Sequence, residues 1–419
     1  MTLVLALVAV ALAQEEEPNY DDLDMAERVL RSRLYLAAVE EEAIHREFRS
    51  YLSFDPKADR AARGRVTDKI RIESRVELTG TYDDNIFLTS TDETADFIAV
   101  AVGSFAALYE DDSVDVGLHY TLRERVYADN TQLSGPEHLA HGRVLWRMSS
   151  IEIQAWYSYS QAKDPTDAIV LQRPVDRRIE DTGASFAFPF SKCRFELSGR
   201  LTVIDIAQDI PGFFGYREWN VTATAAMDLV VRTEVFAEAG RTGDAFDQSV
   251  LDDYMVTFVA TGVRGRPVQK LAVIAKVGWM WIDVDEASGS FDRRDEQGLL
   301  AHGGASWRLW ETTLILAGVR REPVAAHQTG GAIRTQLDLS CQQWLAERVI
   351  GSAGVWWALG QDDGPGGDRT TYGVRIGVRY EMGRRFHATC DVEYRAGGNL
   401  KFETSYDNVR ASIGLSMEW

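Results

Sequence analysis

The sequence predicts an all-β protein, an antiparallel transmembrane β-barrel of about 18 strands (16–18) that follows a signal peptide and a short N-terminal α-helix. Three observations predict this fold. Apolar and polar residues alternate along nearly every segment from residue 70 to residue 419. Short turns take turns with long polar connections, and the number of strands is even. A soluble sandwich also shows alternating residues, but the regular alternation of turns and loops is typical of outer-membrane barrels.

Residues 1–13 are predicted to be a secretory signal peptide. An apolar run over residues 3–13 ends in the small-x-small sequence Ala11-Leu12-Ala13, and polar residues follow from Gln14. A run of about 11 residues is too short to cross a bilayer as a helix. We therefore expect cleavage after Ala13 and export of the chain.

Residues 14–69 are predicted to stay in the periplasm as an acidic segment, an amphipathic helix and a linker. Apolar residues recur every three or four positions over residues 30–51, which is the period of a helix. Pro56 and the charged stretch 57–69 end this pattern. The helix could plug the barrel from the periplasmic side or contact another protein there.

From residue 70 the apolar period changes to 2 and remains so. In the first strand one face carries Ile70, Ile72, Val76, Leu78 and Tyr82, and the other carries Arg71, Glu73, Arg75, Glu77 and Thr79. The same alternation occurs over residues 114–122, 151–159, 193–203, 219–227, 271–281, 333–341, 374–380, 388–394 and 411–419. Nine long and eight short connections would join 18 strands and leave both ends of the barrel domain, residues 70–419, on the short-turn side. Closure removes every free strand edge, which a lipid environment requires.

The composition excludes several classes of function. The chain has 45 Lys and Arg against 64 Asp and Glu, and its net charge of −19 argues against nucleic acid as a partner. Cys193, Cys341 and Cys390 are odd in number and far apart, so we expect lone apolar thiols. GxSxG, HExxH, Walker and CxxC motifs do not occur, so the sequence predicts no enzyme, no catalytic or metal-binding residues and no cofactor. His138 and His141 are expected in a hydrated interior.

The positions between the apolar ones predict a charged pore wall. Eight residues are expected to line it, namely Arg71, Arg75, Glu218, Glu234, Glu238, Arg375, Arg379 and Arg410. The arginines would gather where the first and last strands meet, and the glutamates would lie across the barrel. Such opposed rows would set up a transverse field that sorts solutes by charge. The alternative is a neutral ladder of ion pairs. A barrel of 18 strands is wide enough for an aqueous channel.

Apolar and aromatic side chains are expected in two further places. On the second strand the inward positions are interpreted as Phe97, Ala99, Ala101, Gly103, Phe105 and Ala107, against which the N-terminal helix or a long loop could pack. Two interfacial girdles are expected to include Trp279, Trp281, Trp356, Trp357, Tyr380 and Trp419. Trp156 and Trp356 have inward parity, so the alternative for these two residues is a track on which a substrate stacks.

Two short segments resemble known signatures. Leu415, Met417 and Trp419 resemble the C-terminal signature that the barrel-assembly machinery recognises in outer-membrane proteins. The segment Thr81-Tyr82-Asp83-Asp84-Asn85-Ile86-Phe87 resembles the Tyr-x-Asp-Asn-hydrophobic-Phe signature of a family of outer-membrane β-barrel porins. Many members of that family are encoded beside exopolysaccharide export genes.

The resemblance implies a location in the bacterial cell outer membrane and a porin-like channel for the passive passage of hydrophilic solutes. The alternatives are the exit barrel of an exopolysaccharide secretion system and a closed structural barrel. The expected partners are outer-membrane lipids, the barrel-assembly machinery, and small hydrophilic solutes or polysaccharide.

Overall fold

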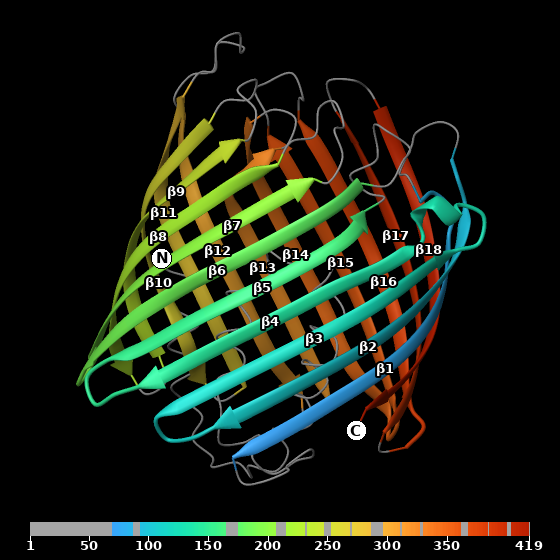
Figure 1. Ribbon diagram of the computed structural model, residues 1–419, viewed down its shortest axis with the longest axis horizontal. Coiled ribbons are helices and arrows are strands. Elements are labelled where there is room, and N and C mark those ends of the chain that lie inside the picture. The colour runs from blue at the N-terminus through green and yellow to red at the C-terminus, as the bar shows by residue number, and fades with distance from the viewer. Residues whose placement is uncertain are drawn as a thin grey trace.

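The computed structural model describes residues 69–86, 93–164, 175–206, 215–230, 233–246, 253–268, 270–285, 296–310, 312–326, 330–361, 368–383, 385–399 and 404–418. Their strands form one closed antiparallel barrel of 18 strands, as the sequence predicts (Figure 1). The signal peptide, the amphipathic helix and the linker up to residue 68 lie outside the described residues, as do Phe87 and Trp419.

The strands follow one another around the barrel in chain order. They are β1 (Ile70–Asp83), β2 (Asp96–Glu110), β3 (Val114–Tyr127), β4 (Gly135–Arg147), β5 (Glu152–Asp164), β6 (Val175–Phe190), β7 (Cys193–Ile206), β8 (Tyr216–Val230), β9 (Thr233–Phe246), β10 (Asp253–Val268), β11 (Leu271–Asp285), β12 (Glu296–Trp310), β13 (Thr313–Ala326), β14 (Gly330–Ala346), β15 (Val349–Gln361), β16 (Arg369–Glu381), β17 (Phe386–Asn399) and β18 (Thr404–Glu418). Among the described residues a 3-10 turn, η3 (Thr131–Leu133), stands between β3 and β4. No helix within the described ranges is long and apolar enough to cross a bilayer.

The two ends of the barrel differ in the length of their connections. At one end the strands are joined by short turns, such as residues 191–192 and 347–348. At the other end most connections are longer, the longest being residues 84–95 between β1 and β2. Two connections predicted to be long are short, because the strands extend into them: residues 327–329 join β13 to β14, and residues 400–403 join β17 to β18. The pairing of β13 with β14, for example, continues as far as Ala326 and Gly330, beyond the strand ends that the sequence pattern predicts. The strands have 13 to 17 residues, and about 9–11 suffice for a membrane crossing, so they project beyond the apolar layer.

Apolar side chains cover the outside of the barrel. Leu78, Ile413 and Leu415 are 59%, 67% and 56% exposed, whereas the alternating residues Glu77 and Ser416 are 9% and 7% exposed. The curvature of a closed sheet crowds side chains on its concave face and separates them on its convex face. The exposed apolar rows are therefore the outer, lipid-facing surface, and the polar rows face the lumen.

The predicted girdles are confirmed for several aromatic residues. Trp279 and Trp281 are 43% and 40% exposed on the outer face of β11, toward the long loops. Tyr380 is 45% exposed on the outer face of β16, toward the short turns. Trp357 also has outward parity, because it pairs with Leu337 and Tyr372. Trp356 has inward parity and belongs to the lumen.

All three cysteines have outward parity. Cys193 and Cys390 are exposed and Cys341 is partly exposed, and each is a free thiol. Cys390 pairs with Val378 and Ile413, both of which lie on the lipid-facing surface. The prediction of lone apolar thiols is confirmed.

The predicted parity of β2 is wrong. The pairing of Tyr82 with Phe97 puts Phe97, and with it the expected inward set Ala99, Ala101, Gly103, Phe105 and Ala107, on the lipid-facing side. Phe97 and Phe105 are 52% and 47% exposed. Both rows of β2 are apolar, so the sequence alone cannot distinguish its two faces. Ile98, on the inner face, is 3% exposed and packs in the cluster of Ile86, Tyr127 and Leu133.

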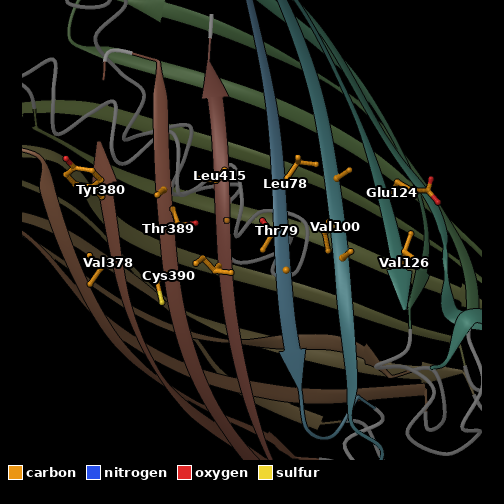
Figure 2. Close-up of a pocket in the computed structure, with 16 residues that line it drawn as sticks. Leu78, Thr79, Val100, Glu124, Val126, Val378, Tyr380, Thr389, Cys390 and Leu415 are labelled. Carbon is orange, nitrogen blue, oxygen red and sulfur yellow. The ribbon is translucent and has the colours of Figure 1, made fainter. Parts of the chain in front are cut away.

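The barrel closes where β1 pairs with β18. On the lipid-facing side an apolar depression of about 630 Å³ crosses this seam (Figure 2). Small residues form its floor and longer ones its flanks, among them Leu78, Val126, Val378, Tyr380, Ile413 and Leu415. Since nearly all of its lining is apolar and lies on the lipid-facing surface, we expect acyl chains of the membrane to occupy it.

At the long-loop end the seam finishes in a hydrogen-bonded clasp made of Asp83, Asp84, Asn85, Asn408 and Arg410. The Asn408 amide Nδ2 donates to Asp83 Oδ1 at 2.5 Å, to Asp84 Oδ1 at 3.3 Å and to the Asn85 carbonyl at 3.2 Å. Arg410 Nε lies 3.2 Å from Asp83 Oδ2. The residues that carry the family resemblance therefore join the first strand to the last.

At the short-turn end the first strand is held by an exposed ion pair. Lys69 Nζ lies 2.9 Å from Asp111 Oδ1, and the Lys69 carbonyl accepts a hydrogen bond from the Glu110 amide. The hydrogen bond from the Lys69 ammonium lowers the pKa of the Asp111 carboxyl. Both partners are exposed, so this pair positions the chain and adds little stability.

Replacing Asn408 tests the clasp. Asn408→Ala removes three hydrogen bonds and leaves the buried Asp83 carboxylate without one of its donors. We expect the free energy of unfolding to fall by about 1–3 kcal/mol, measured by urea unfolding of the refolded barrel. Ser405→Ala, at an exposed position of the same strand, is the control. Equal stability of the two variants would show that backbone pairing alone holds the seam.

Candidate functional site: the charged inner wall

The eight predicted pore-lining residues all have inward parity. Arg71 and Arg75 lie on β1, Arg375 and Arg379 on β16, Arg410 on β18, Glu218 on β8, and Glu234 and Glu238 on β9. β1 and β18 are paired, which brings three of the arginines to the seam. β8 and β9 are also paired, but Glu218 lies opposite Asp244 near the long-loop end, whereas Glu234 and Glu238 lie toward the short-turn end. That these residues line a conducting pore stays a prediction.

Most of these charges have an opposite charge beside them. At the seam, Arg71 pairs with Glu73, and Arg75 pairs with Glu77 at 2.5 Å. On β16, Arg375 Nε lies 3.7 Å from Asp391 of β17. The arrangement favours the ladder of ion pairs over two opposed rows of single sign.

The acidic group of β9 is compensated by two cations that the sequence analysis missed. Arg264 of β10 pairs with Glu234, and Lys276 of β11 pairs with Glu238 at 3.0 Å. The side chains of Lys276 and Glu238 are 6% and 13% exposed. Inward parity of the neighbouring strand is the signal that finds Arg264, because Arg264 lies directly opposite Glu234.

Two phenylalanines lie flat on the same part of the wall. The Arg264 guanidinium carbon is 5.1 Å from the Phe236 ring centroid, and Lys276 Nζ is 5.8 Å from that of Phe258. Phe236 covers Gly262, where an added Cβ would lie 2.5 Å from the ring. The glycine thus lets the ring lie against the backbone instead of projecting into the lumen. Each cation gains a ring face in addition to its carboxylate partner.

The inward tryptophans follow the same pattern. Trp356 of β15 lies across Gly373 of β16, where an added Cβ would be 2.7 Å from the indole. The guanidinium of Arg395 stands 5.7 Å from the Trp356 ring centroid. Trp156 of β5 covers Gly183 of β6 in the same way. The inward parity of both tryptophans is as predicted, and a stacking track along them stays a prediction.

The described start of β14 leans across the long-loop end of the lumen toward β10. Cα atoms of the two strands come within 8 Å, although β11, β12 and β13 separate them in the sheet. Ile333 packs against Val256 and Met280 of the inner wall, which are 2% and 0% exposed. Ile333 Cδ1 also lies over Gly298 of β12, 3.7 Å from the position that a Cβ would occupy there, which is an ordinary van der Waals distance. This contact narrows the lumen on one side.

The histidines do not form a metal site in the described part of the chain. His138 has outward parity and contacts Tyr120, with Nδ1 2.8 Å from the hydroxyl, so its expected place in the interior is wrong. His141 faces the lumen opposite His119 and lies 2.8 Å from Ser158 Oγ. Positions three apart in a strand point to opposite faces, which explains the difference. Among the described residues no group of three potential metal ligands occurs.

Comparison with known proteins gives a likeness of architecture alone. No known protein family matches the chain, and no curated protein matches its sequence. The outer-membrane protein OpdK of Pseudomonas aeruginosa is 12% identical with a TM-score of 0.48, covering 83% of this chain and 99% of its own. OccK2 (OpdF) of the same organism is 8% identical with a TM-score of 0.47, covering 83% and 98%. OccAB3 of Acinetobacter baumannii is 8% identical with a TM-score of 0.46, covering 84% and 99%.

The geometry defines the class of protein. A closed barrel whose outer face is apolar and whose inner face is charged satisfies every backbone group in lipid and keeps its polar surface away from it. The chain is an integral β-barrel protein of the bacterial outer membrane. Its short turns then face the periplasm and its long loops the cell exterior.

A double-mutant cycle tests the compensation of charge on the wall. Glu238→Gln leaves the buried Lys276 ammonium without its carboxylate, and Lys276→Met leaves the carboxylate alone. Each single variant should lose stability because it leaves a buried charge without its partner. In urea unfolding, the sum of the two single losses of unfolding free energy should exceed the loss in the double variant by about 1–3 kcal/mol. A coupling near zero would mean that water screens both charges.

Proposed function

We propose that this protein is a channel for the passive passage of hydrophilic solutes across the outer membrane. The observation that carries the proposal is the inner wall, whose charged side chains face the lumen from strands all around the barrel. Ionised groups keep their charge at low cost only in contact with water or with a partner. An 18-strand barrel has room for water beyond its wall side chains.

The pairing of charges supports weak selectivity between anions and cations. Arg264, Lys276 and Arg410 each face a carboxylate at close range, so their fields are largely cancelled in the lumen. Arg375 differs, because its side chain is 52% exposed and its contact with Asp391 is long. Arg375 is therefore the paired arginine of the wall that projects most into the lumen.

The direct test is single-channel conductance of the purified full-length protein in a planar bilayer. Discrete steps with a permeability ratio of K⁺ to Cl⁻ near unity are expected. Absence of conductance would support a closed structural barrel. Block of the current by added oligosaccharide from one side would instead favour the exit of polysaccharide.

Reversal of one charge tests the role of Arg375. Arg375→Glu places a second carboxylate beside Asp391 and should shift the reversal potential toward cation selectivity, severalfold in the permeability ratio at low salt. High salt should reduce the shift, because the charge is exposed. Glu124→Gln, on the lipid-facing side of β3, is the matched control and should leave selectivity unchanged. Unchanged selectivity in Arg375→Glu would place the conduction path elsewhere.

Loosening the contact between β14 and β10 tests the narrowing of the lumen. Ile333→Ser removes apolar contact with Val256 and Met280 and should release the start of β14 from the wall. We expect larger or noisier current steps than in the wild type. Leu339→Ala, a lipid-facing change on the same strand, should leave the steps unaltered. Identical steps in all three proteins would show that the contact does not limit conductance.

A further inference from the structure

The outer face of β8 and β9 carries two arginines, Arg217 and Arg241, near the long-loop end of the barrel. Arg217 lies near the long-loop end of β8, and Arg241 lies on β9 opposite Val221 and Thr257. Both side chains are exposed. The upper ends of the two strands run side by side in Figure 1. These arginines therefore face the outer leaflet of the membrane.

In the described part of the barrel, no ion pair involves either arginine. The register puts Asp205 of β7 diagonal to Arg217, two positions from its partner Val203. Arg241 has Val221, Thr257 and the diagonal residues Ala223 and Val259 around it, none of them acidic. Leaving cations at the lipid interface is costly unless they meet an anion there. In a chain with a net charge of −19, the exposed pair also stands out by its sign.

An aromatic platform lies between the two arginines. Trp219 pairs with Gly243 of β9. On the same strand, Gly243 lies midway between Ala245, the partner of Arg217, and Arg241. An added Cβ at Gly243 would lie 2.5 Å from the indole Nε1, so the ring lies flat across the glycine. One face of the indole is thereby pressed on the backbone and the other is turned outward. Trp281, opposite Thr257, continues this surface.

We propose that Arg217, Trp219 and Arg241 form a headgroup site for a phosphorylated glycolipid of the outer leaflet. The two guanidinium groups bind phosphate oxygens, a geometry that suits bidentate contacts. The outward face of the indole stacks on a sugar ring between them. Acyl chains of the same lipid continue down the apolar rows of β8 and β9, over Val221, Ala223 and Ala239. The proposal rests on the location in the outer membrane and is independent of channel activity.

The test is the affinity of full-length protein in detergent for bisphosphorylated lipid A, followed by titration in native mass spectrometry. Arg241→Gln should weaken binding about tenfold, since a charge-assisted contact is lost, and Arg217→Gln/Arg241→Gln should weaken it further. Trp219→Leu should lower affinity severalfold. Lipid A without phosphates should bind the wild type and the double variant equally.

Arg178→Gln is the matched control. Arg178 is also an exposed outward arginine near the long-loop end, but it is paired with Glu180, so its loss should leave the affinity unchanged. Heat-modified migration on gels verifies that each variant is folded. The proposal is overturned if the double variant binds bisphosphorylated lipid A as the wild type does. It is equally overturned if Arg178→Gln weakens binding as much as Arg241→Gln, since any surface arginine would then suffice.

Discussion

The pairing of β1 with β18 is the constraint on which the rest of the structure depends. In lipid an unpaired backbone amide or carbonyl cannot form a hydrogen bond with water, so an open sheet of this length could not exist there. Closure brings residues 83–85 against residues 407–410, more than three hundred positions later in the chain. The clasp is polar because it lies where the strands emerge from the apolar layer. Asp83 serves both parts of the structure, since one of its oxygens meets Asn408 in the seam and the other meets Arg410 on the inner wall.

The inner wall resolves a conflict between width and charge. Long charged side chains that extended into the lumen would fill it, and unpaired ones would create strong local fields. Here they lie along the wall, where Lys276 meets Glu238 and Arg395 meets both Glu393 and the ring of Trp356. The same lateral packing explains why such charged residues are little exposed in a barrel that we propose to be hydrated.

Period-2 alternation predicted the number of strands, most of their faces and the charged residues of the wall. It did so because each strand of a barrel in lipid carries apolar residues on its outer face and polar residues on its inner face. It failed on β2, where Val100 and Ala101 are equally acceptable on either face and only the pairing with β1 decides. It also missed Lys276 of β11 as the partner of Glu238 of β9. Strand β10 lies between these two strands, and the long lysine side chain reaches across it. The clasp could be recognised as a motif, but its role required knowledge of which strand closes the barrel.

The glycines beneath the inward rings give the wall a property beyond packing. Phe236 rests on Gly262 and Trp356 on Gly373, in both cases on the strand next to its own. At Gly373 any larger residue would lift the Trp356 ring off the backbone and into the lumen. The bore of such a barrel can therefore be adjusted by a single methyl group on one strand while the ring that does the obstructing stays on another. Barrels with the same number of strands could then differ in the width of the lumen through substitutions of such glycines alone.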